Sequence, residues 1–131
     1  MNDILVDSSV WISYFKSRKE FSFMDDLIDD YRICINDVIL TELLPSIMHQ
    51  KEFVLANLLR SINKYDMNIN WQEIQNYQLL NIKNGNNKVP ITDVLIAQNC
   101  IRNDLILLTL DKHLILMKNY LPLQIYEFST K

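Results

Sequence analysis

Glycine, proline and cysteine are scarce in this sequence. Its 131 residues include one Gly, three Pro and two Cys, and no stretch is of low complexity. Collagen-like, disordered and repeat proteins have the opposite composition, so these classes are excluded. Hydrophobic residues make up 49% of the chain and charged residues 22%, which is enough apolar material for a core. We therefore expect one globular domain that spans residues 1–131.

Two further absences concern location and metal chemistry. No apolar run approaches the roughly 18 residues that cross a bilayer, and no basic segment precedes an apolar one at the start of the chain. We expect a cytoplasmic protein that makes no membrane contact. Cys34 and Cys100 have apolar neighbours and no other Cys or His at metal-ligand spacing. They are predicted to be buried thiols rather than disulfide partners or zinc ligands.

The chain also lacks an excess of basic residues. Its formal net charge is -3 at pH 7, with 13 Lys and Arg against 16 Asp and Glu. A protein that binds nucleic acid only by neutralising phosphates is strongly basic. If nucleic acid is the substrate, another source of positive charge has to be present.

Short apolar runs alternate with helical patterns along the chain. Strands are predicted at residues 4–6, 32–36, 67–70, 105–108 and 124–126. Helices are expected after the first two strands, over residues 51–63 and 71–83, and before and after the fourth strand. Ser8, Ser9 and Asp37 are expected to cap the first two helices, with a break near Pro45 and His49. The strands are apolar throughout, which predicts a three-layer α/β/α sandwich around a parallel sheet of four or five strands.

Two carboxylates follow predicted strands. Asp7 ends the first strand, and Asp111 lies three residues after the strand at 105–108. Ligands of open α/β sheets bind in the crevice outside the carboxyl ends of the strands, so both are candidate site residues. Each of the two could equally well be only a helix N-cap.

Two further acids lie on predicted helices. Asp93 shares a helix face with Ile96, Ala97 and Cys100, and that face is expected to pack on the sheet, where an acid is costly. The alternative is a solvated first-turn Asp favoured by the helix dipole. Glu42 lies one turn into the helix that follows the second strand, and an exposed helical Glu is its simpler interpretation.

The four acids together are more informative than any one of them. Three start or precede helices that follow strands, so they are expected to converge on one edge of the sheet. Carboxylates held close together repel one another and take up protons unless cations are present. An all-oxygen site without Cys or His suits Mg²⁺ or Mn²⁺, which would also supply the positive charge that the composition lacks.

Four sequence blocks resemble the PIN-domain ribonucleases, and more narrowly the VapC-type toxins of toxin–antitoxin pairs. The blocks are ILVDSSVWI at residues 4–12, LTELL at 40–44, TDVLIA at 92–97 and LLTLDKH at 107–113. Their order and spacing are preserved, and the resemblance runs from Ile4 to about Phe128. The chain departs from the family at Gln98 and Asn99, where small residues are usual, and at Leu110 and Leu114.

The resemblance implies a PIN-like fold and a metal-dependent nuclease. Asp7, Glu42, Asp93 and Asp111 would be the catalytic, metal-binding acids, with Mg²⁺ or Mn²⁺ as cofactor. Ser8 and Thr109 would have a supporting role. The implied reaction is endonucleolytic hydrolysis of RNA phosphodiester bonds, in tRNA or rRNA, by a toxin that inhibits growth or translation. A small VapB-like antitoxin and a second copy of the chain, in a homodimer, would be its protein partners.

Other interpretations stay open. The chain could be a PIN-like binding module without catalysis, or a PIN nuclease of RNA processing rather than a toxin. Phosphoryl transfer on Asp7 is disfavoured, because Ser9 stands where dehalogenase-like phosphatases need a second Asp. His113 could be a general acid but fits a packing or surface residue better. Basic residues near the motifs are candidates for RNA contact, namely Lys16, Arg18, Lys19, Lys88 and Lys112.

Overall fold

A parallel sheet of five short strands forms the centre of the molecule. The computed structural model describes residues 2–130. The strands are β1 (Ile4–Val6), β2 (Ile33–Ile35), β3 (Asn63–Lys64), β4 (Ile106–Leu108) and β5 (Gln124–Ile125). They lie in the order β3-β2-β1-β4-β5, and every neighbouring pair is parallel. The predicted fold class, an α/β sandwich with a parallel sheet of up to five strands, is confirmed.

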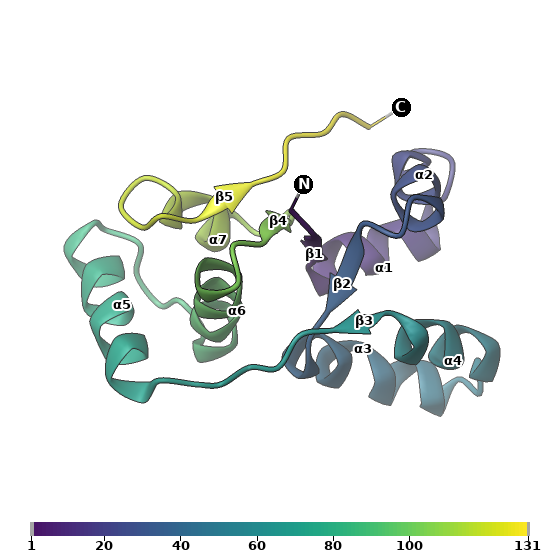
Figure 1. Cartoon of the computed structure of the whole chain (residues 1–131), viewed down its shortest axis with the longest axis horizontal. Helices are drawn as coiled ribbons and strands as arrows, with labels where there is room; N and C mark the ends of the chain where they lie inside the picture. The colour runs from purple at the N-terminus through teal and green to yellow at the C-terminus, as the bar shows by residue number, and fades with distance from the viewer. Residues whose placement is uncertain (1, 131) are drawn as a thin grey trace.

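Helices cover both faces of this sheet. They are α1 (Ser8–Lys16), α2 (Phe23–Asp29), α3 (Asp37–His49), α4 (Phe53–Ser61), α5 (Trp71–Lys83), α6 (Ile91–Arg102) and α7 (Lys112–Met117). The chain adds β2 and then β3 on one side of β1, and afterwards adds β4 and then β5 on the other side of β1. Right-handed crossovers therefore place α1 to α4 on one face and α5 to α7 on the other, the arrangement that Figure 1 shows.

The reversal of strand order puts a crevice between β1 and β4. These neighbours pair Ile4 with Ile106 and Val6 with Leu108, and the N–H of Asp7 donates to the carbonyl of Leu108 over 2.9 Å. The connections leave the carboxyl ends of β1 and β4 toward opposite faces, which opens the edge of the sheet at that point. Asp7 and the segment that carries Asp111 thus meet at the place where this fold binds ligands.

The core explains why the strands are apolar throughout. All three residues of β1 are fully buried, as is Trp11 on α1. Cys34 and Cys100 are buried free thiols, as predicted. In residues 2–130, no helix is both long enough and apolar enough to cross a membrane.

The third strand was predicted in the wrong place. It lies at Asn63–Lys64, and residues 66–70 form an irregular segment outside the sheet, in which Asn68 has a positive φ of 43°. Side chains of α6 bind the backbone of this segment: Asn99 donates to the carbonyl of Asp66, Arg102 to that of Asn68, and Gln98 to that of Asn70. The alternating apolar residues at 67 and 69 suggest a strand, but helix side chains replace a neighbouring strand as bonding partners.

The helices α2 to α4 also differ from prediction. Asn36, not Asp37, is the N-cap of α3, because its side chain accepts the N–H of Ile39. No break occurs at Pro45: α3 continues to His49, although a proline lacks the N–H of a helical hydrogen bond. Leu43 and Ile47 are buried on either side of Pro45 and hold the helix against the core. The helix predicted at 51–63 is shorter, and α2 was not predicted.

Candidate active site

Asp7 is held by two hydroxyl groups. It is only 4% exposed and occupies the N-cap position of α1, yet its side chain makes no capping hydrogen bond. Its Oδ2 instead accepts hydrogen bonds from Ser9 Oγ at 2.7 Å and from Thr109 Oγ1 at 2.8 Å. Oδ1 has no donor among residues 2–130 and is left to face other ligands. The alternative interpretation of this acid as a helix cap is therefore wrong.

The same hydroxyls fix the loop that follows β4. Thr109 Oγ1 accepts the N–H of Asp111 at 2.9 Å, and Ser9 Oγ accepts the N–H of Leu110 at 3.1 Å. Each hydroxyl thus donates to Asp7 and accepts from the loop, which locks residues 109–111 against the end of β1. Ser9 was not among the predicted site residues. The only signal in the sequence was a hydroxyl residue close after Asp7, and Ser8 met that description equally well.

Asp111 lies across the crevice from Asp7. It is the N-cap of α7, and its Oδ1 accepts the N–H of His113 at 2.8 Å. Its carboxylate is partly exposed. A capping acid can still offer its second oxygen to a ligand, so the capping and site interpretations are both compatible with this geometry.

Asp93 is the least satisfied of the four acids. It lies in the first turn of α6, is 6% exposed, and its Oδ2 is buried without a hydrogen-bond partner in the described residues. Burial raises the pKa of Asp93 to about 7, with further contributions from the negative charges of Asp111, Asp7 and Glu42. The alternative of a solvated first-turn Asp is thereby wrong. A buried carboxylate oxygen with no partner needs either a proton or a cation.

Glu42 completes the group from α3. It is the most exposed of the four acids, and Ser8 Oγ donates to its Oε1 at 3.3 Å. Its pKa is raised by partial burial and by the charges of Asp7 and Asp111, and the Ser8 hydroxyl opposes this rise. The structure therefore brings all four predicted acids into one electrostatically coupled cluster. Ser8 and Thr109, the predicted supporting residues, bond to Glu42 and Asp7 respectively.

The donor set of this cluster suits a hard divalent cation. Its ligands are carboxylate and hydroxyl oxygens, which Mg²⁺ and Mn²⁺ prefer, and the unpartnered Oδ2 of Asp93 lies among them. As the side chains stand, no group of three His, Cys, Asp or Glu within residues 2–130 is closed enough to hold a metal ion. Carboxylates without a cation between them repel, so an open arrangement is the expected one.

A groove of about 450 Å³ runs beside Glu42, between α1 and α3. Polar and apolar side chains share its wall, and Lys16 contributes a cation. The lining residues are Ile12, Phe15, Lys16, Glu42, Leu43, Ser46, Ile47, Gln50 and Glu52.

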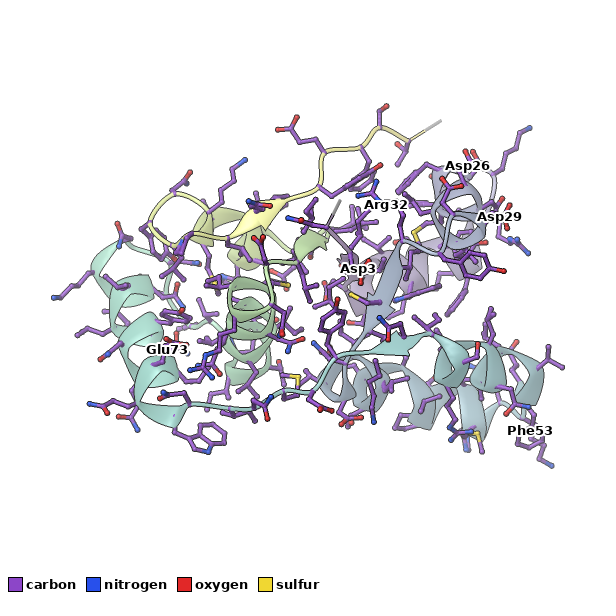
Figure 2. The ribbon with its side chains drawn as sticks, viewed as in Figure 1. Asp3, Asp26, Asp29, Arg32, Phe53 and Glu73 are labelled. Atoms are coloured by element: carbon purple, nitrogen blue, oxygen red, sulfur yellow. The ribbon has the colours of Figure 1, made fainter. Side chains whose placement is uncertain are left out.

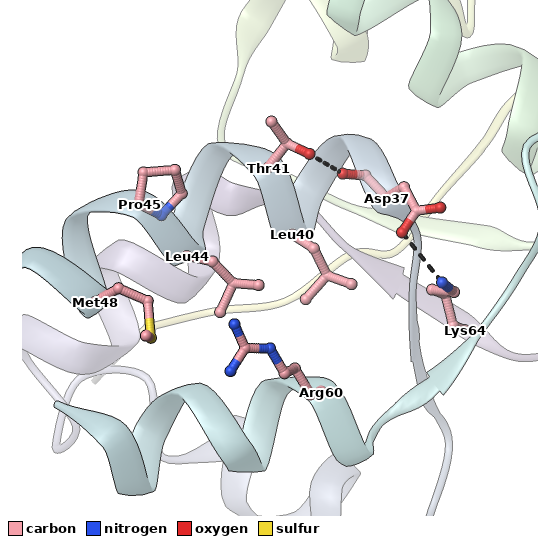
Figure 3. Close-up of a pocket in the computed structure, with 8 residues that line it drawn as sticks. All are labelled: Asp37, Leu40, Thr41, Leu44, Pro45, Met48, Arg60 and Lys64. Atoms are coloured by element: carbon pink, nitrogen blue, oxygen red, sulfur yellow. Dashed lines mark hydrogen bonds and ion pairs between the residues drawn. The ribbon is translucent and has the colours of Figure 1, made fainter.

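A larger groove, of about 650 Å³, lies between α3 and α4 (Figure 3). The Arg60 side chain extends between the two helices, and Lys64 pairs with Asp37 at 3.2 Å. None of the four acids lines this groove. The smaller groove is therefore the one that continues from the acidic cluster.

His113 is held as a packing residue. Asn86 Nδ2 donates to the carbonyl of His113 at 2.9 Å, so its Oδ1 is the atom that meets His113 Nδ1 at 2.8 Å. Nδ1 consequently carries the proton. Among the basic candidates, Arg18 is engaged elsewhere: it donates to Tyr14 and to Asp25, and Tyr14 also donates to Asp25. Figure 2 labels the neighbouring acids of α2, Asp26 and Asp29, on the outside of the molecule.

Comparison with known proteins gives one family and one fold. Residues 4–119 match the sequence model of the PIN domain family. VapBC from Salmonella typhimurium bound to DNA has a similar fold, with a TM-score of 0.73, 16% identity, and coverage of 96% of this chain and 98% of that chain. VapBC2 from Rickettsia felis bound to a promoter DNA fragment has a TM-score of 0.72 and 15% identity, and the match covers 96% of this chain and 98% of that chain. FitAcB from Neisseria gonorrhoeae has a TM-score of 0.68 and 16% identity, and the match covers 95% of this chain and 96% of that chain. No curated protein sequence matches the chain.

Proposed function

The chain belongs to the PIN domain family, and on that premise we propose that it is a divalent-cation-dependent endoribonuclease. The observation that carries the proposal is the buried, unpartnered Oδ2 of Asp93 within reach of the charges of Asp7, Asp111 and Glu42. Four acids that share a crevice without a basic partner are costly to maintain, and a cation site explains their presence.

Asp7, Glu42, Asp93 and Asp111 would hold one or two Mg²⁺ or Mn²⁺ ions. Such an ion, when bound, supplies positive charge for the phosphate and makes a water molecule easier to deprotonate. Asp93 contributes the buried carboxylate that fixes the cation in the crevice. Ser9 and Thr109 both bind Oδ2 of Asp7 and so fix the orientation of this carboxylate. Glu42, which lies nearest solvent, joins this cluster to the groove between α1 and α3.

The RNA strand would lie along this groove. The exposed Ile12 and the partly exposed Phe15 can contact bases, and Lys16 can contact a phosphate. The substrate would be tRNA or rRNA.

We assign the nuclease to the toxin class of the family. Each VapBC neighbour matches nearly the full length of this chain, and the three compared folds come from VapBC or FitAcB structures. The proposed partners are a small VapB-like antitoxin and a second copy of this chain in a homodimer. A toxin would arrest growth when produced without its antitoxin, whereas a nuclease of RNA processing would not.

The test is cleavage of total RNA by the purified protein with Mn²⁺ or Mg²⁺, with EDTA, and with Asp7→Asn. Asp29→Asn, an exposed acid of α2, serves as the matched control. Discrete fragments are expected from the wild type and from Asp29→Asn, and none with EDTA or Asp7→Asn. Equal cleavage by the wild type and Asp7→Asn would contradict the proposal. An absence of cleavage by either, with antitoxin binding intact, would favour the non-catalytic binding module.

A further inference from the structure

Two buried asparagines connect the helices that carry Glu42 and Asp93. Asn36 and Asn99 are both fully buried, and Asn36 Nδ2 donates to Asn99 Oδ1 over 2.9 Å. Asn36 is the N-cap of α3, and Asn99 lies in the middle of α6. These helices come from opposite faces of the sheet, so this hydrogen bond crosses between the two layers that supply the acids.

The two outer ends of this amide pair determine its chemistry. At one end Asn36 Oδ1 accepts the N–H of Ile39, which can only donate. At the other end Asn99 Nδ2 donates to the carbonyl of Asp66, which can only accept. A chain that starts at a donor and ends at an acceptor needs one accepting and one donating atom in each linking side chain. Two carboxamides in series satisfy this need. An ionised Asp at position 36 would cap α3 but has no donor, and the single oxygen of Ser or Thr lies closer to the backbone than Asn36 Nδ2.

The spacing from this bond to the acids is equal on both helices. Glu42 follows Asn36 by six residues, and Asn99 follows Asp93 by six residues. At about 1.5 Å of rise per residue, each acid lies about 9 Å along its helix from the amide pair. A tilt of either helix at the amide pair therefore shifts its carboxylate by an amount comparable to a coordination tolerance. Mg²⁺ in particular requires near-ideal ligand distances.

Neighbouring residues of α6 hold the same helix from its other side. Gln98 donates to Glu73 Oε1 at 2.8 Å and exchanges hydrogen bonds with both backbone groups of Asn70. Figure 2 shows Glu73 on α5, the helix that packs on α6. Gln98 and Asn99 together thus fix the position of α6 relative to α5, to the 66–70 segment and to α3.

We propose that Asn36 and Asn99 are positioning residues that set the separation of Glu42 and Asp93 for cation binding. This inference rests on the proposed function, because it assigns a purpose to the acidic cluster. Neither amide touches the acids, so their effect on the cation acts through the helices. Residues that hydrogen-bond directly to metal ligands typically contribute about 10- to 100-fold to metal affinity, and we expect these asparagines, which act one step further away, to fall at the low end of that range.

The test measures Mn²⁺ affinity by electron paramagnetic resonance of the free ion, without any RNA. Asn36→Ser keeps an N-cap acceptor for Ile39 but removes the Nδ2 atom, and its shorter side chain ends about one bond length short of the contact with Asn99. Asn99→Leu keeps the approximate side-chain volume but breaks both bonds. The matched control is Ile74→Val, which removes a buried methyl group of α5 and leaves the amides intact. Circular dichroism and melting temperature establish that each variant is folded and how far it is destabilised.

We expect Asn36→Ser and Asn99→Leu each to weaken Mn²⁺ binding about tenfold or more. The double variant should be no weaker than the weaker single variant, because all three lack the same bond. Ile74→Val should change the affinity less than twofold, even with a comparable loss of melting temperature. Unchanged Mn²⁺ affinity in the folded asparagine variants would overturn the inference alone. Absence of Mn²⁺ binding in the wild type would contradict the proposed function and remove the basis of the inference with it.

Discussion

Thr109 donates its hydroxyl hydrogen to Oδ2 of Asp7 over 2.8 Å, although the two residues are 102 positions apart in the chain. The same hydroxyl accepts the N–H of Asp111. One side chain thus joins the ends of β1 and β4 and relates two of the four acids. The arrangement makes the acidic cluster sensitive to substitutions that leave every carboxylate in place.

Thr109→Val is expected to destabilise the protein by about 1–3 kcal/mol, because it leaves buried polar groups without partners at nearly constant volume. Urea unfolding followed by circular dichroism measures this loss. Thr41→Val is the matched control, since the Thr41 hydroxyl bonds only to the carbonyl of Asp37 on the exposed side of α3. If Thr109→Val lowers the free energy of unfolding no more than Thr41→Val does, the hydrogen bond to Asp7 does not stabilise the fold.

Asp93→Asn is expected to stabilise the protein in EDTA above about pH 7. The pKa of Asp93 is raised from 3.8 to about 7 in the folded state. Between these values the unfolded chain has lost the proton that the folded chain retains, so rising pH favours unfolding. The amide variant removes this contribution and should melt a few degrees higher at pH 8 but not at pH 4. Asp29→Asn controls for the loss of one surface charge. Equal pH dependence in the wild type and Asp93→Asn would contradict the raised pKa.

Cation binding is expected to reverse that destabilisation. Carboxylates that repel one another gain a common partner, and a ligand at about 100 times its dissociation constant adds about 2.7 kcal/mol of stability. Melting curves in EDTA, Mg²⁺ and Mn²⁺ should therefore show a rise of several degrees with either cation. Asp93→Asn should lose most of this rise, whereas Asp29→Asn should keep it. If millimolar cation shifts both variants and the wild type equally, the stabilising ion binds somewhere other than the cluster.

Lys16→Ala is expected to weaken RNA binding more than it slows catalysis. Lys16 lines the groove beside Glu42, so it is placed to neutralise one phosphate of the bound strand. Its removal should raise KM severalfold. It should also reduce the magnitude of the slope of log affinity against log salt concentration by about 1, the amount expected for one lost phosphate contact. Lys83→Ala, at the exposed end of α5, is the control. If Lys16→Ala and Lys83→Ala have the same KM, the groove beside Glu42 is not the RNA-binding groove.

The central sheet could be predicted because its strands are apolar on both faces and therefore have to be buried on both. The residues of β1 and β4 are apolar on both faces, and only a parallel sheet covered by two helical layers buries both. β3 could not be found in the same way. Its residues, Asn63 and Lys64, are exposed at the edge of the sheet and carry no hydrophobic signal. Residues 66–70, which follow β3, are held by hydrogen bonds from the side chains of Gln98, Asn99 and Arg102. These side chains lie about 30 residues away in the sequence.

The gathering of the four acids in one crevice could be predicted, as could the contact of Thr109 with this cluster, but not the other groups that hold the acids. Asp7 and Asp111 follow strands, and Asp93 lies on an otherwise apolar helix face. Each of these patterns was ambiguous alone, and the four acids became informative only together and through the resemblance to the PIN family. The donation of Ser9 to Asp7 depends on the exact start of α1, and the contact between Asn36 and Asn99 depends on how two helices cross. Such tertiary contacts leave no periodic signal in one sequence.

The central claim is that Asp7, Glu42, Asp93 and Asp111 form a cation site. The most direct measurement is anomalous scattering at the manganese absorption edge from a crystal of the protein soaked in Mn²⁺. The account predicts one or two anomalous peaks bounded by these carboxylates, with Asp93 Oδ2 among the ligands, and no peak there in Asp93→Asn. Full Mn²⁺ occupancy at another position, with the crevice between β1 and β4 empty, would contradict it.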